Sequence, residues 1–127
     1  MGNLLKIIKQ ERKERICAGL KYFSTSKSVL KELGEPIIVE DDHICLFAVV
    51  VNNIVGFLSY NNSKILYVYV LPEYRKRGIF TKLYNELPKQ NWIVMSSNLA
   101  KPIYEKRGFR VVKSYKTCHK MKLKNNE

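Results

Sequence analysis

Three cations and a glycine, in the run 75–78, stand between a segment typical of a strand and one typical of a helix. Residues 65–71 are β-branched and aromatic, and apolar residues in 79–87 recur at helical spacing. A glycine turn at a helix start favours phosphate, because the first helical amides lack carbonyl partners and the helix dipole is positive there. Three cations fit a ligand with several phosphates. A solvated surface turn would give the same pattern.

The phosphate motifs of two large nucleotide-binding classes are missing from the chain. Neither the Walker sequence G-x-x-x-x-G-K-[ST] nor the dinucleotide motif G-x-G-x-x-G is present. ATP and dinucleotides are therefore disfavoured as ligands, although a phosphate site is still predicted at 75–78.

A second group of residues with possible chemistry lies about twenty positions later, in 97–109 (SNLAKPIYEKRGF). Ser97 and Asn98 offer hydrogen bonds directly after a short apolar run. Tyr104 lies on a predicted helix that stops at Gly108, and a phenol can donate a proton. An ordinary aromatic residue of an amphipathic helix would look the same, so this segment alone does not decide the function.

Taken together, these two segments resemble the GNAT superfamily of N-acetyltransferases. Residues 70–79 (VLPEYRKRGI) are similar to its V-x-P-x-x-[RQ]-x-x-G-x-[GA] loop, and 97–109 are similar to its N-x-x-A-x-x-x-Y-E-K-x-G-F helix. The two motifs occur in the expected order and at the expected separation. With the preceding hairpin, the resemblance covers about residues 44–112.

The resemblance implies an enzyme that transfers an acetyl group from acetyl-CoA to a primary amine by direct attack, with no metal. The pantetheine arm would pair with the strand at 68–70, and a backbone N–H near Tyr69 or Val70 would polarise the acetyl carbonyl. Tyr104 would be the catalytic proton donor to the departing thiolate. The implied cofactor residues are Val68, Tyr69, Val70, Arg75, Lys76, Arg77, Gly78, Ile79, Phe80, Thr81, Ser97 and Asn98.

Four features depart from the family's pattern. Phe80 replaces a small residue of the loop, and Ser97 stands where Asn is usual, with Asn98 next to it. Neither 65–71 nor 92–96 contains an acid, which puts a dedicated general base in doubt. Residues 1–35 look wholly helical, whereas the family commonly begins with a strand. The run 36–40 is a candidate to replace that strand.

The elements that must position these residues form an α+β, three-layer arrangement. The patterns predict an N-terminal helical pair, a mostly antiparallel mixed sheet and two later helices. Strands are expected at 36–40, 44–51, 54–60, 65–71, 92–95, 109–113 and 117–123, with helices at 79–87 and up to about 106. The length of 127 residues suits a single domain, 1–127.

Charge is the strongest compositional signal. Lys and Arg number 23 against 11 acids, a net charge of +12, and residues 72–127 hold fourteen basic and four acidic residues. Such a surface attracts nucleic acid, acidic protein or a polyphosphate. Two other functions therefore stay open: a catalytically silent CoA- or partner-binding module, and a nucleic-acid binder or acetyltransferase directed at RNA or the ribosome. Small amines, proteins and aminoacyl-tRNA are all possible acceptors.

The remaining composition excludes several classes. No apolar run approaches the roughly 20 residues of a membrane span, and the N-terminus lacks a signal-peptide pattern. We therefore expect a cytoplasmic protein with no membrane partner. Cys17, Cys45 and Cys118 are widely spaced, which predicts three reduced, mostly buried thiols and no metal. His43 and His119 are isolated and are interpreted as strand or turn residues.

Overall fold

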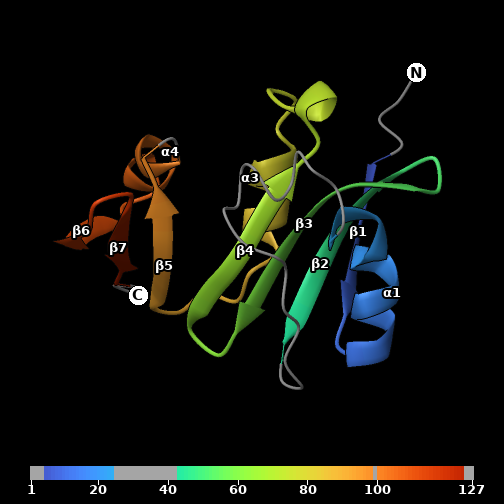
Figure 1. Cartoon of the computed structure of the whole chain (residues 1–127), viewed down its shortest axis with the longest axis horizontal. Coiled ribbons are helices and arrows are strands. Elements are labelled where there is room, and N and C mark those ends of the chain that lie inside the picture. The colour runs from blue at the N-terminus through green and yellow to red at the C-terminus, as the bar shows by residue number, and fades with distance from the viewer. Residues whose placement is uncertain (1–4, 25–42, 99, 125–127) are drawn as a thin grey trace. The chain divides into compact units, whose positions relative to one another are not determined.

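The computed structural model describes residues 5–24, 43–98 and 100–124. Seven strands in this part of the chain form a mixed sheet in the order β1-β2-β3-β4-β5-β7-β6 (Figure 1). The chain divides into two compact units, one with 67–87 and the residues up to 61, the other with 62–66 and the residues from 88 onward. The α+β class with a largely antiparallel, mixed sheet is confirmed. The single domain predicted for 1–127 stays a prediction.

The first element in the described residues is a strand, so the prediction that residues 1–35 are wholly helical is wrong. Strand β1 is Leu5–Gln10, and it pairs antiparallel with β2 through pairs such as Ile7 with Ala48. Helix α1 follows at Lys13–Ser24. Leu5 and Ile7 are half-buried while Lys6 and Ile8 are exposed, which is the alternation of a strand. In so short a run, the spacing of apolar residues in the sequence does not distinguish a strand from a helix.

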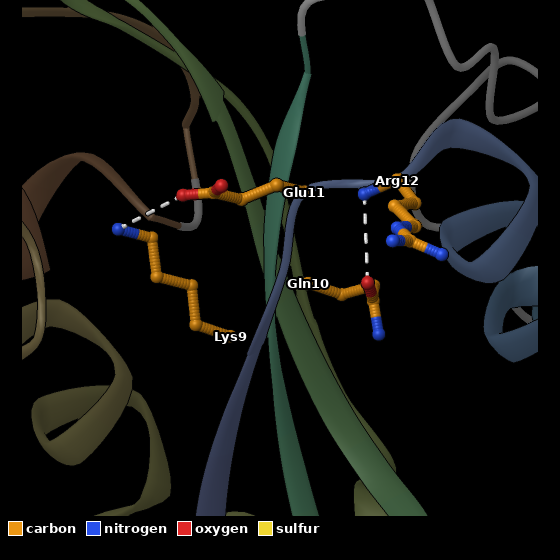
Figure 2. Close-up of polar contacts among 4 residues, drawn as sticks. All are labelled: Lys9, Gln10, Glu11 and Arg12. Atoms are coloured by element: carbon orange, nitrogen blue, oxygen red, sulfur yellow. Dashed lines mark hydrogen bonds and ion pairs between the residues drawn. The ribbon is translucent and has the colours of Figure 1, made fainter.

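The turn between β1 and α1 is polar and exposed (Figure 2). The Arg12 amide N donates to Gln10 Oε1 at 3.5 Å, and Lys9 Nζ lies 3.3 Å from Glu11 Oε1. An ion pair this exposed contributes at most about 1 kcal/mol. The charged run 9–15 is thus divided between a strand, a turn and a helix.

Since β1 already pairs with β2, it occupies the place that 36–40 was expected to take. The run 36–40 and the second helix of the predicted N-terminal pair lie outside the described residues.

The first unit contains the strands predicted at 44–51, 54–60 and 65–71. They are β2 at Ile44–Val50, β3 at Asn53–Asn61 and β4 at Lys64–Val70, of which only the second half belongs to this unit. Its core cluster joins Ile16 and Leu20 of α1 to Cys45, Phe47, Phe57 and Tyr69 of the strands. Every residue from 55 to 60 is buried. Because alternate strand residues point to opposite faces, both faces of β3 are covered.

Past β4, a short 3₁₀ turn η1 at Pro72–Tyr74 leads through a loop to helix α3 at Ile79–Asn85. Helix α3 packs on β2 and β3 and buries Ile79 and Leu83 (Figure 1). It ends two residues before the predicted end at 87. This helix and α1 both contribute to the covering of the first unit's sheet.

The second unit contains β5 at Trp92–Ser97, α4 at Lys101–Lys106, β6 at Arg110–Ser114 and β7 at Cys118–Leu123. β7 lies between β5 and β6 and pairs antiparallel with both (Figure 1). The start of β4 joins this unit by parallel pairing of Lys64 with Ile93 and Ile65 with Val94. These elements match the sequence prediction, with β5 longer by two residues.

None of the helices in the described ranges is long and apolar enough to cross a membrane. Of the three free thiols, Cys17 is exposed, Cys45 buried and Cys118 half-buried, so the prediction of mostly buried thiols fails for Cys17. Burial raises the pKa of the Cys45 thiol to about 12, because a thiolate there would lose its hydration.

Candidate functional site

The end of β4 is held tightly against β3, and a glycine makes this possible. A Cβ on Gly56 would lie 2.9 Å from the Tyr69 carbonyl oxygen and 3.3 Å from Val70 Cα. The Leu71 amide N donates to the Val55 carbonyl at 2.8 Å, which extends the contact past the last strand residue. The predicted cofactor residues Val68–Val70 therefore have a backbone position fixed by close packing.

Tyr69 itself faces the core of the first unit and is 4% exposed. Its ring lies 6.4 Å from the Phe57 ring, centroid to centroid. The Arg75 guanidinium carbon stands 5.3 Å from the Tyr69 ring centroid, and Arg75 Nε donates to the Val70 carbonyl at 2.8 Å. Arg75 thus fastens the start of the loop to the end of β4.

Two left-handed residues shape the loop between η1 and α3. Lys76 has a φ of +63° and Gly78 a φ of +77°, so two left-handed residues flank Arg77. A turn with left-handed residues directs successive amides toward one side, and such concavities bind anions. A Cβ on Gly78 would meet nothing within 4 Å, which leaves open space beside the backbone at this point.

The predicted loop residues 75–81 form the turn into α3 and its first residues, and Arg75, Lys76 and Arg77 are exposed. Gly78 is the N-cap of α3, and its carbonyl accepts the first helical hydrogen bond, from the Lys82 amide at 3.0 Å. The Arg77 guanidinium carbon lies 5.1 Å from the Tyr74 ring centroid. Phe80 is half-buried, with its ring 6.0 Å from that of Tyr84 on the same helix. Its bulk is therefore accommodated along α3.

In the second unit, Tyr104 occupies the middle of α4 and is 4% exposed. Its ring meets Phe109 edge-on, with centroids 5.2 Å apart. The helix ends as predicted: the Tyr104 carbonyl accepts the amides of Arg107 and Phe109, and Gly108 has a φ of +95°. The ring of the predicted proton donor is therefore fixed by packing.

Ser97 and Asn98, the two candidates for one cofactor hydrogen bond, differ in what they contact. Ser97 Oγ accepts the Ala100 amide at 3.1 Å and so closes the turn before α4. Asn98 Oδ1 bonds His119 Nε2, and His119 Nδ1 lies 2.9 Å from Ser114 Oγ. Because a carbonyl oxygen only accepts, the neutral tautomer of His119 that fits this arrangement has its proton on Nε2, and the Ser114 hydroxyl then donates to Nδ1.

The Asn98–His119–Ser114 chain was missed by sequence reasoning, which treated His119 as isolated. Ser114 and His119 face each other across the β6–β7 hairpin, and Ser96 pairs with His119 on the other side. Knowledge of the register of the β6–β7 hairpin would have been enough to place Ser114 opposite His119. The sequence carries no local signal that brings Asn98 to them from twenty-one positions away.

Residues 7–122 match the family described as the acetyltransferase (GNAT) domain, and the chain belongs to this family. Among solved structures, it is similar to a PaiA N-acetyltransferase from Thermoplasma acidophilum in complex with coenzyme A. The TM-score is 0.70 at 17% identity, covering 94% of this chain and 99% of that one. The resemblance inferred from the two motifs is thus confirmed.

Two further solved structures share the fold. Escherichia coli ElaA gives a TM-score of 0.71 at 12% identity, covering 94% of this chain and 99% of that one. A GNAT-family acetyltransferase from Staphylococcus aureus Mu50 gives 0.70 at 17% identity, covering 96% and 99%. At these identities the likeness establishes the fold alone. No curated protein matches the sequence.

Proposed function

We propose that this GNAT-family protein is an N-acetyltransferase that transfers the acetyl group of acetyl-CoA to a primary amine. The observation that carries the proposal is the loop at 75–78, where three cations and two left-handed residues precede α3. Acetyl-CoA, when bound, supplies an activated thioester and a phosphate-rich end. The neighbour from Thermoplasma acidophilum was solved in complex with coenzyme A, which supports the same ligand class here.

In this proposal, the first unit holds the cofactor. Residues 76–81 bind the pyrophosphate through backbone amides and the cations of Lys76 and Arg77. Arg75 holds the loop to β4 through the Val70 carbonyl. The strand backbone at 68–70 pairs with the amide-bearing arm, as an added strand would. Since Gly56 fixes the carbonyl of Tyr69 and the backbone of Val70, a nearby N–H is preorganised to polarise the acetyl carbonyl.

The motif at 97–109 supplies a hydrogen-bond donor and an acid in this proposal. Asn98 is the better candidate for the cofactor hydrogen bond, because its amide offers two N–H donors, whereas the Ser97 hydroxyl, whose oxygen accepts the Ala100 amide, offers one. With its oxygen engaged by His119, Asn98 presents its NH₂ group to a ligand carbonyl. Tyr104 donates the proton to the leaving thiolate, from a ring held in place by Phe109.

The acceptor amine arrives largely deprotonated in this mechanism, because neither β4 nor β5 carries an Asp or Glu as general base. The catalytic efficiency is then expected to rise with pH toward the acceptor's own pKa. Small amines, proteins and aminoacyl-tRNA all stay possible acceptors, and the cytoplasmic location stays a prediction.

Labelled acetyl-CoA incubated with the protein and a fractionated lysate tests the proposal directly. We expect the label to enter one fraction of the lysate when the folded protein is present, and no fraction when the protein is omitted or heat-denatured. Acetyl-CoA binding in calorimetry, with no label transferred to any fraction, would favour the alternative of a catalytically silent CoA-binding module. Absence of acetyl-CoA binding would overturn both.

A further inference from the structure

One face of the second unit's sheet carries two rows of cations. In the first row, Met95 of β5 pairs with Lys120 of β7, which pairs with Lys113 of β6. In the second row, Ile93 pairs with Lys122, which pairs with Arg110. Residues paired across antiparallel strands point to the same face, so these six side chains lie together.

The opposite face of the same strands is the buried one. Val94 is 4% exposed, Ser96 1% and Met121 0%, and these residues alternate with the two cationic rows. By contrast, Met95 is 53% exposed, and Arg110, Lys113 and Lys122 are all exposed. Among the described residues, the cationic face thus carries its charges and an apolar methionine in contact with solvent.

Keeping these charges together costs stability. Lys113 stands directly opposite Lys120, and Arg110 directly opposite Lys122. Like charges placed opposite one another destabilise a sheet relative to neutral residues. Glu105, on α4, is the one acid in 88–124, so the surrounding sequence offers little compensation. A bound polyanion would remove the repulsion.

We propose that this face, defined by Arg110, Lys113, Lys120 and Lys122, binds the phosphodiester backbone of single-stranded nucleic acid. Cations two residues apart on β7 are separated by roughly 6.6 Å along the strand, and neighbouring strands by about 4.8 Å. A backbone that follows a cationic surface while its bases contact apolar and aromatic groups fits this arrangement. Exposed Met95 lies within it, and Lys113 Nζ stands 5.2 Å from the ring centroid of Tyr115, which is 46% exposed.

Fluorescence anisotropy with the whole chain and a labelled uridine 12-mer measures this binding over a range of salt concentrations. Neutralising two contacts in the variant Lys120→Gln/Lys122→Gln should reduce the slope of log K against log salt by about 1.4. The affinity should fall about tenfold or more. The control Lys101→Gln/Lys106→Gln removes the same charge from α4 and should change the affinity less than twofold. A thymidine 12-mer distinguishes RNA from DNA as the source of the phosphates.

Equal weakening by the two double variants would overturn the proposal, because net charge alone would then explain the binding. A polyglutamate peptide that binds as tightly as the uridine oligonucleotide would overturn it in favour of an acidic protein. These measurements contain no acetyl-CoA, so their outcome is independent of the proposed acetyl transfer.

Stability provides a second test of the same face. Lys120→Glu would turn its pair with Lys113 into one of opposite charge, so Tm should rise by roughly 1–4 °C while nucleic-acid affinity falls. A lower Tm together with unchanged affinity would show that the cations are neither strained nor used.

Discussion

The faces of the sheet are covered to different extents in the two units. In the first, β3 is buried at every position from 55 to 60, and helices α1 and α3 pack on the strands. In the second, β5 alternates between buried and more exposed residues, and its cationic face is open to solvent. Where both faces are covered, chemistry can use only strand ends and loops. Where one face is open, strand side chains themselves are available to a partner.

The largest effect is expected from Tyr104, which belongs to the buried side of the second unit. Tyr104→Phe should lower kcat by about 10²–10⁴, because the acid is lost while the ring and its contact with Phe109 remain. The affinity for acetyl-CoA, from calorimetry, should change little. Steady-state kinetics with a verified acceptor measure kcat. A near-wild-type kcat would assign the proton to water or another residue.

A pair of truncations tests the difference in covering directly. Phe57→Ala removes a fully buried ring of the first unit and should cost about 3–5 kcal/mol in the free energy of unfolding. Met95→Ala, on the cationic face, should change it by no more than about 0.5 kcal/mol. Urea unfolding of both variants measures these values. Similar costs would mean that the second unit's open face is covered in solution.

At the loop of the first unit, Gly78→Glu should weaken acetyl-CoA binding at least about 100-fold, because it introduces bulk and negative charge where phosphates are proposed to lie. Gly78→Asn is the matched control, since Asn tolerates a positive φ better than most residues and brings no charge. Calorimetry gives the affinities, and thermal unfolding checks that both variants fold. Unchanged affinity in folded Gly78→Glu would remove the loop from the site.

Much of the fold and the family was predictable because the information is local. Strand runs such as 54–60 and the motif at 70–79 are short, continuous patterns. The start of the chain was not predictable in this way. Leu5–Gln10 is short, and its apolar residues fit a helix as well as a strand, so its pairing with β2 decided the outcome.

The roles of single side chains depend on contacts between distant residues. The loop position of Arg75 was apparent from the motif, but its bond to the Val70 carbonyl was not. Likewise, the choice between Ser97 and Asn98 needed the three-residue chain through His119 to Ser114, which joins three separate elements. Register and turn geometry are needed for such contacts, and the residue types alone do not supply them.

The smallest predicted effect tests whether Asn98 or Ser97 makes the cofactor hydrogen bond. Asn98→Ala should raise the KM for acetyl-CoA about three- to tenfold with little change in kcat, as expected for one lost neutral hydrogen bond. Ser97→Ala is the matched control. It removes an acceptor used by the Ala100 amide and should lower stability by about 1 kcal/mol while leaving KM unchanged.

His119→Phe should produce part of the Asn98→Ala effect, because Asn98 would lose the partner that orients its amide. Nitrogen NMR of the two histidines reports which ring nitrogen of His119 carries the proton, a property that a purely structural role of His119 would not change. In the wild type, His119 should show its proton on Nε2, and Ser114→Ala should weaken that preference, since the hydroxyl that donates to Nδ1 is gone. A proton on Nδ1 would reverse the assignment, because Asn98 would then donate to His119 and present its oxygen to the ligand.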